Sequence, residues 1–169
     1  IIYNIKNMTP EEKVRIKIDQ WFADAGWEVI NRDEYEPTST AVAIREGLLK
    51  GNLEVDYFLF INGKAVGVLE AKREETDAFS SIVCEQAALY ARSVPNIYQT
   101  YQKPLPFIFT SNGKELYFCD FREQDHYFKQ IMTIPTPHEL VKKLGINDYF
   151  AGLPTCLLYT SPSPRDYAA

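Results

Sequence analysis

The stretch that decides the fold is Glu54-Val-Asp-Tyr-Phe-Leu-Phe-Ile-Asn-Gly-Lys-Ala-Val-Gly-Val-Leu-Glu-Ala-Lys72, in which two apolar runs flank an Asn-Gly pair. Asn-Gly between such runs is the strongest short signal for a β-hairpin, because both residues tolerate the positive φ angles of a tight turn. Apolar side chains occupy both alternating positions of the runs, so both faces of the hairpin are expected to be buried. The sequence therefore predicts a central sheet with helices on its two sides.

The hairpin also carries three charged residues, Asp56, Glu70 and Lys72. Buried strands rarely hold charge without a partner or a function. Two carboxylates offer the hard oxygen ligands that Mg²⁺ prefers, and a lysine beside them can stabilise a hydroxide and the charge that grows on a phosphate. This pattern is typical of metal-dependent phosphodiester hydrolysis. The alternative is an ion cluster of two acids and a lysine at the end of a sheet, with no catalytic role.

The length of the turn decides whether the two acids can meet. With a strict two-residue turn at Asn62-Gly63, Asp56 lies opposite Leu69 and points away from Glu70. An odd loop or a bulge brings both acids to one face, which Lys72 shares because it follows Glu70 by two residues. We therefore expect a three-residue loop with Gly63 in a left-handed conformation, or a bulge in one strand.

Three further residues are candidates for the same site. Gln86 and Tyr90 are four residues apart on an expected helix, so they share one face, where one can fix a ligand or Lys72 and the other can reach a phosphate. The alternative is that the pair has no functional role and simply belongs to the surface and the core side of the helix. Glu46 is a possible auxiliary acid near the metal, although a solvated charge paired with Arg45 or Lys50 explains it equally well.

The remaining elements follow from capping and periodicity. Thr9-Pro10-Glu-Glu12 and Thr136-Pro137-His-Glu139 are capping boxes that begin helices. Helices are expected over 10–25, 81–92 and 137–144, and strands over 27–30, 55–61, 65–71, 107–110 and 115–121. Residues 41–46 fit either a helix or a strand. This order predicts a mixed α/β/α sandwich.

The composition is that of one ordinary globular domain, with 169 residues, 46% hydrophobic and 24% charged. Neither an apolar run of about 18 residues nor a secretory signal is present, so a cytoplasmic location without membrane contact is expected. Three scattered cysteines and two histidines argue against a zinc site or a disulfide framework.

The charge balance bears on nucleic acid binding. A formal charge of -5 and a pI near 5.1 argue against a free-standing nucleic-acid binder, so other parts would supply much of the grip on DNA. Isolated cations could contact phosphates but are usually only solvated. These cations are Lys64, Arg73, Arg92 and Lys103.

The end of the chain has a different character. Cys156-Leu-Leu-Tyr-Thr-Ser-Pro-Ser-Pro-Arg-Asp166 resembles the in-frame translation of a sequencing-library adapter. The alternative is a Pro/Ser-rich surface tail or linker. We expect residues 156–169 to be non-native and the natural reading frame to be cut near Thr155.

Four segments together resemble the N-terminal endonuclease domain of the restriction (R, or HsdR) subunit of type I restriction-modification enzymes. The resemblance covers most of residues 9–144. The segments are Ala43-Ile-Arg-Glu-Gly47, residues 55–74, Glu85-Gln-Ala-Ala-Leu-Tyr90 and Pro106-Phe-Ile-Phe-Thr-Ser-Asn-Gly113.

This resemblance implies a PD-(D/E)xK nuclease fold and assigns roles to single residues. Asp56 and Glu70 match the metal-binding acids, and Lys72 matches the motif lysine. Gln86 and Tyr90 match the family's QxxxY element, which is similar to one in RecB-like nucleases. Val55 stands where the motif's name has proline, at a position that varies.

The implied function is an Mg²⁺-dependent endonuclease that hydrolyses phosphodiester bonds of foreign double-stranded DNA. Residues 1–155 would be the nuclease domain of a longer subunit whose missing motor domains bind ATP and translocate DNA. Methyltransferase (M) and specificity (S) subunits would be its partners. Two alternatives remain: an inactive PD-(D/E)xK scaffold for DNA binding or complex assembly, and the nuclease domain of another helicase-fused enzyme. All three motif positions are intact, which favours activity.

Overall fold

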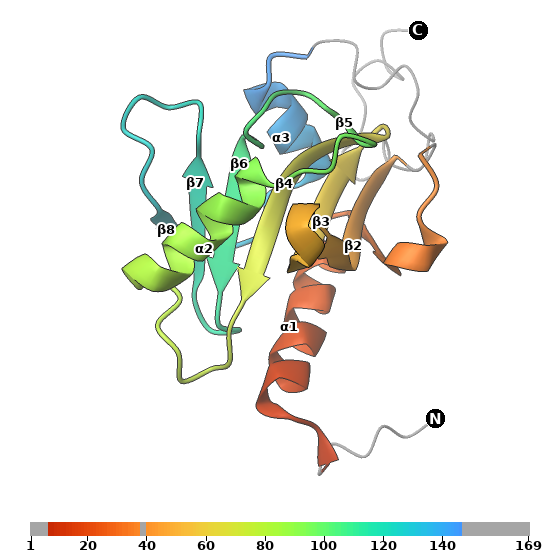
Figure 1. The fold of residues 1–169 in the computed structure, drawn as a ribbon. Coiled ribbons are helices and arrows are strands. Elements are labelled where there is room, and N and C mark those ends of the chain that lie inside the picture. Colours follow the sequence, from red (N-terminus) through yellow and green to blue (C-terminus); the bar gives the residue numbers. More distant parts are fainter. Residues whose placement is uncertain (1–6, 38–39, 147–169) are drawn as a thin grey trace, which may run out of the picture.

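The computed structural model describes residues 7–37 and 40–146. Helices and strands alternate irregularly along these residues, and Figure 1 shows their arrangement. In chain order they are α1 (Pro10–Asp24), β1 (Glu28–Asn31), η2 (Arg32–Glu34), β2 (Ala41–Leu48), η3 (Lys50–Asn52), β3 (Glu54–Ile61), β4 (Lys64–Ala71), α2 (Ser81–Arg92), β5 (Gln99–Thr100), β6 (Phe107–Ser111), β7 (Leu116–Asp120), β8 (Lys129–Ile131) and α3 (Pro137–Lys143).

The strands form one mixed sheet. Its order is β1-β2-β3-β4-β6-β7-β8, and β5 also pairs with β4. Three pairs are parallel, namely β1 with β2, β4 with β5 and β4 with β6, and the others are antiparallel. Residues 41–46, which the sequence left open, belong to strand β2 between β1 and β3.

Helices cover both faces of this sheet. The apolar stripe of α1, which includes Val14 and Ile18, packs with Leu140 of α3 against one face. Ala87 and Ala91 of α2 pack against the other face, over β4 and β6 (Figure 1). The predicted fold class, a mixed sheet between helical layers, is confirmed. None of the described helices is long and apolar enough to cross a membrane.

Both predicted capping boxes are present. The backbone N–H of Glu12 donates to Thr9 Oγ1 (3.2 Å), and the N–H of Thr9 donates to Glu12 Oε2 (2.8 Å). Thr136 and Glu139 make the same reciprocal pair at α3. These bonds satisfy amide groups that the first turn of a helix leaves without partners, which explains why both helices begin where the sequence predicts.

The hairpin turn is a two-residue turn. Ile61 pairs with Lys64, and the residues between them, Asn62 and Gly63, have φ angles of 50° and 77°. Positive φ at both central residues matches the right-handed twist of the flanking strands. Gly63 is left-handed as expected, and of the two expected alternatives, a three-residue loop or a bulge, the loop is not the one observed.

A bulge follows the turn, which is the second of the two expected alternatives. Phe60 pairs with Ala65, whereas Leu59 pairs with Gly67, so Val66 is an extra residue on β4. An extra residue reverses the alternation of side chains beyond it. Consistent with this, Val66 packs on the α1 face of the sheet and Val68, two residues later, packs on the α2 face.

The bulge brings the two acids opposite each other. Tyr57 pairs with Leu69, so the next position in the same register places Asp56 opposite Glu70. Without the bulge Asp56 would lie opposite Leu69. The geometric condition for a common site is therefore met.

Gly67 is a sensitive point of this hairpin. A Cβ atom there would lie 2.4 Å from the carbonyl oxygen of Phe107 on β6, and backbone cannot easily yield. We expect Gly67→Ala to lower the free energy of unfolding by about 3 kcal/mol, measured by urea denaturation. Gly51→Ala is the control, because its Cβ meets nothing within 4 Å and only its φ of 71° is unfavourable. It should lose about 1 kcal/mol; equal losses would contradict the steric argument.

Candidate active site

Asp56, Glu70 and Lys72 gather at the end of the sheet where β3 begins and β4 ends. Lys72 directly follows β4, and its backbone N–H donates to the carbonyl of Ser111 (2.8 Å), which extends the pairing with β6. The side chain of Glu70 is 7% exposed, whereas the side chains of Asp56 and Lys72 are 12% and 29% exposed. The cluster therefore has a sealed carboxylate at its base and a lysine that reaches solvent.

Glu70 has one paired and one unpaired oxygen. Lys72 Nζ lies 3.1 Å from Glu70 Oε1. Glu70 Oε2 is buried and has no hydrogen-bond partner among the described residues. Burial and, to a smaller extent, the charge of Asp56 raise the pKa of Glu70 to about 7, although Lys72 acts in the opposite direction. A proton or a cation at Glu70 would relieve this cost.

Asp56 is held through both of its oxygens. Its Oδ2 accepts the backbone N–H of Ala71 (2.7 Å), and its Oδ1 accepts Nη2 of Arg15 (2.6 Å). Arg15 comes from α1, in the helical layer on one face of the sheet. Arg15 was not among the residues predicted for the site, because nothing in its helical spacing distinguishes it from a solvated arginine.

Glu46 joins the cluster through the same arginine. Arg15 Nη1 donates to Glu46 Oε1 (2.9 Å), and Glu46 pairs with neither Arg45 nor Lys50 in the described structure. The alternative partner Arg45 is bound to Asp19 instead.

The backbone at Glu46 is unusual as well. Its φ is 53°, a left-handed conformation that is costly for a side chain of this size. Arg32 Nη1 donates to the carbonyl oxygen of Glu46 (2.9 Å) and so helps to hold this conformation. The role of Glu46 as an auxiliary acid stays a prediction.

Gln86 and Tyr90 lie together on α2, as the four-residue spacing predicts. Gln86 Nε2 donates to Tyr90 Oη (2.8 Å). Burial raises the pKa of Tyr90, and the charge of Glu70 adds to the effect, which indicates that the phenol lies near the acids. The predicted residues are thus neighbours, while their catalytic roles stay predictions.

The residues present fit a hard divalent cation. Asp56 and Glu70 supply carboxylate oxygens, and the buried Oε2 of Glu70 can accept a cation in place of a proton. No group of three or more His, Cys, Asp or Glu side chains able to hold a metal occurs in residues 7–37 and 40–146. With two protein carboxylates, a cation here would keep several water ligands, as Mg²⁺ commonly does in proteins.

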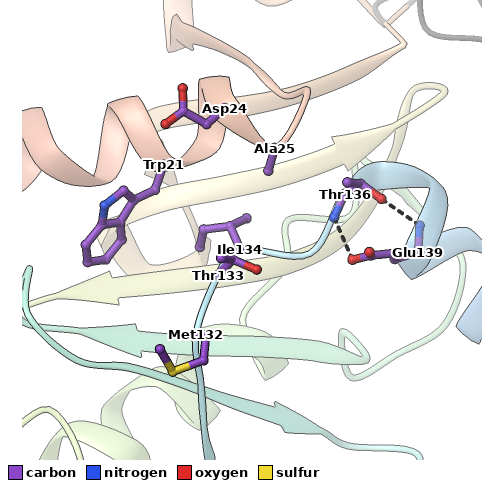
Figure 2. A pocket seen from close by; sticks show the side chains of 8 residues that line it. All are labelled: Trp21, Asp24, Ala25, Met132, Thr133, Ile134, Thr136 and Glu139. Carbon is purple, nitrogen blue, oxygen red and sulfur yellow. Dashed lines mark hydrogen bonds between the residues drawn. The ribbon is translucent and has the colours of Figure 1, made fainter. Parts of the chain in front are cut away.

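A separate hollow of about 330 Å³ lies beside α1, between that helix and the segment that leads into α3 (Figure 2). Its two acids are already engaged: Asp24 accepts Nε2 of Gln20 (2.7 Å), and Glu139 belongs to the capping box of α3. None of the predicted site residues lines it. It is therefore not the candidate active site.

The chain matches the sequence model for the second domain of the type I restriction enzyme EcoKI endonuclease subunit over residues 30–144. It belongs to this HsdR endonuclease family. A solved fragment described as an HsdR subunit of a type I restriction enzyme from Vibrio vulnificus YJ016 has a similar fold, with a TM-score of 0.55 and 22% identity. The match covers 83% of this chain and 27% of that chain. No curated protein matches.

The raised pKa of Glu70 predicts a pH-dependent stability. Glu70 holds its proton more tightly in the folded chain than its usual pKa of 4.5 allows, so the stability it contributes is present below pH 4.5 and is lost as pH rises through about 7. Glu70→Gln has no proton to lose. In urea denaturation with EDTA, the variant should gain stability relative to the parent chain between pH 5 and pH 8. A constant difference would contradict the raised pKa.

Proposed function

We propose that this chain is the endonuclease module of a type I restriction-modification enzyme and hydrolyses phosphodiester bonds of foreign double-stranded DNA with Mg²⁺. The observation that carries the proposal is the position of Asp56 opposite Glu70 at one sheet end, one step beyond the Tyr57–Leu69 pair, with Lys72 Nζ 3.1 Å from Glu70 and a buried Glu70 oxygen without a hydrogen-bond partner among the described residues. Membership of the HsdR endonuclease family supports it.

Each side chain has a defined task in this reaction. Asp56 and Glu70 would hold Mg²⁺, which when bound polarises the phosphate and lowers the pKa of a coordinated water. Lys72, fixed by Glu70, supplies positive charge to the attacking hydroxide and to the phosphate in the transition state. Gln86 orients the hydroxyl of Tyr90, which can then donate to a phosphate oxygen.

A basic groove at the C-terminal end of α2 favours DNA as the substrate. A hollow of about 280 Å³ at the end of α2 is lined by the cations Lys50, Arg92 and Lys103, and no carboxylate is among its described lining residues. Arg92 is the last residue of α2, and Lys50 begins η3, between β2 and β3. Although the chain as a whole is acidic, this local excess of positive charge can attract a phosphate backbone.

The other two cations that the sequence singled out, Arg73 and Lys64, do not line this groove, although Arg92 also has a partner within the chain, the ring of Phe121. Arg73 forms ion pairs with Glu11 and Glu75, and Lys64 lies over the ring of Tyr101. The groove therefore contains only Arg92 and Lys103 of the four candidates, together with Lys50.

Several wider expectations belong to the proposal. ATP-driven translocation, the M and S subunits and a cytoplasmic location would concern the full-length subunit, of which this chain would be one part. The expected boundary between residues 1–155 and 156–169 lies outside the described residues. An inactive scaffold is the second candidate, and the intact acids and lysine at one sheet end disfavour it.

Loss of Lys72 should stop DNA cleavage without stopping ATP hydrolysis. In the full-length subunit assembled with its M and S partners, Lys72→Met should reduce DNA cleavage about 100- to 1000-fold, because it removes charge stabilisation of the transition state. Asp56→Asn should abolish cleavage. ATP hydrolysis should persist in both variants. Lys64→Met, at the other end of β4, is the matched control and should cut normally. Cleavage by both site variants would rule out this site.

If the groove binds DNA, its cations should contribute to the salt dependence of the DNA binding constant. In an Asp56→Asn background, replacing the three groove cations with glutamine should make the plot of log binding constant for duplex DNA against log salt shallower by about 2.7, or about 0.9 per phosphate contact. Fluorescence anisotropy measures this slope. The same charge change at Lys17, Lys129 and Lys142 should leave the slope unchanged, and equal effects of both triple variants would refute the groove.

A further inference from the structure

Arg15 forms ion pairs with Asp56 of the proposed metal site and with the nearby Glu46. Its Nη2 lies 2.6 Å from Asp56 Oδ1 and its Nη1 lies 2.9 Å from Glu46 Oε1, so one guanidinium bridges two carboxylates from two strands. The helix that carries it is fixed, because Val14 and Ile18 on either side of Arg15 are buried in the core. The backbone of Arg15 is therefore held in place while its side chain, 37% exposed, can move.

Both oxygens of Asp56 are committed in this arrangement. Oδ2 accepts the N–H of Ala71, a bond that belongs to the sheet end, and Oδ1 accepts the arginine. A cation shared by Asp56 and Glu70 must reach an oxygen of Asp56, and Oδ1 is the one whose partner is a flexible side chain. Arg15 thus provides positive charge to the same oxygen that a divalent cation would use.

The formal charges of the cluster support this view. Three carboxylates, Asp56, Glu70 and Glu46, face two cations, Arg15 and Lys72, so the ionised cluster carries one net negative charge. Adding a divalent cation beside both Arg15 and Lys72 would place several positive charges within a few ångströms, which is unfavourable. Departure of Arg15 from Asp56 relieves this repulsion. Glu46, whose side chain is 53% exposed, can keep the arginine afterwards.

We propose that Arg15 is a built-in counter-cation that a divalent metal displaces from Asp56. Arg15 then acts as a positioning residue: it keeps Asp56 ordered without metal and moves towards Glu46 when metal binds. The inference rests on the proposed function, since it takes Asp56 and Glu70 as the metal-binding acids. A purely structural role for Arg15 makes the opposite prediction, because loss of a supporting bond would misplace Asp56 and weaken metal binding.

The affinity for Mn²⁺, a probe of sites built from hard oxygen ligands, separates the two roles. By isothermal titration calorimetry, Arg15→Met should lower the Kd for Mn²⁺ about tenfold, a modest gain because solvent screens a partly exposed charge. Arg15→Lys keeps the charge and should bind like the parent chain. Arg45→Met is the matched control. The side chain of Arg45, on β2, is 36% exposed and pairs with Asp19 of α1, the helix that also carries Arg15. Its loss should leave the Kd for Mn²⁺ unchanged.

A measurement on the parent chain covers the case in which Arg15→Met does not fold. The side-chain NMR signals of Arg15 should shift with added Mg²⁺ along the metal-binding curve, while those of Arg45 should stay in place. Unchanged Arg15 signals at saturating Mg²⁺ would overturn the inference.

The remaining outcomes distinguish this inference from the proposed function. If the parent chain binds Mn²⁺, Asp56→Asn abolishes binding, and Arg15→Met binds equally or more weakly, then the counter-cation role is wrong and the metal site stands. If neither the parent chain nor any variant binds Mn²⁺ or Mg²⁺, both the inference and the metal-dependent function are overturned.

Discussion

The register of the β3–β4 hairpin is the constraint on which the candidate site depends. Side chains alternate along a strand, so a shift of one residue decides whether Asp56 meets Glu70 or turns away from it. Val66 is the residue that makes the shift, since it is left unpaired between Ala65 and Gly67. Both faces of these strands are buried against helices, and any slip would move apolar side chains out of their packed positions. The core therefore fixes the position of the acids.

The same burial determines the electrostatics of the site. Charge is retained at the sheet end because three partners reach it: Lys72 directly after β4, Arg15 from α1 and the N–H of Ala71, the last residue of β4. These partners do not fully balance the acids. Burial of Glu70 and the charge of Asp56 favour uptake of a proton or a cation at Glu70, which is consistent with both the raised pKa of Glu70 and the fit to a divalent metal.

Local signals in the sequence predict most of the fold. The Asn-Gly pair, the two capping boxes and the two-residue spacing of Glu70 and Lys72 act over a few residues, so sequence alone reveals them. Residues 41–46 lack a clear period, and pairing on both sides makes them a strand. Of the two expected alternatives the bulge is the one observed, because Asn-Gly already satisfies a two-residue turn and the extra residue, Val66, is accommodated within β4. Strands β5 and β8 are too short to give a pattern. Arg15 contacts Asp56 across 41 positions of sequence, a contact that only the layered fold creates.

The charge of the chain and the proposed chemistry are compatible once binding and catalysis are separated. Three cations in one groove can neutralise about three phosphates, and contacts of this kind give non-specific dissociation constants of about 10⁻⁴ to 10⁻⁶ M. A net charge of -5 weakens this attraction further. On the proposed function, such a module holds DNA loosely while its acids and lysine are rigidly placed. Cleavage would then depend on DNA that other domains or subunits deliver, and a weak grip would protect DNA that they do not hold.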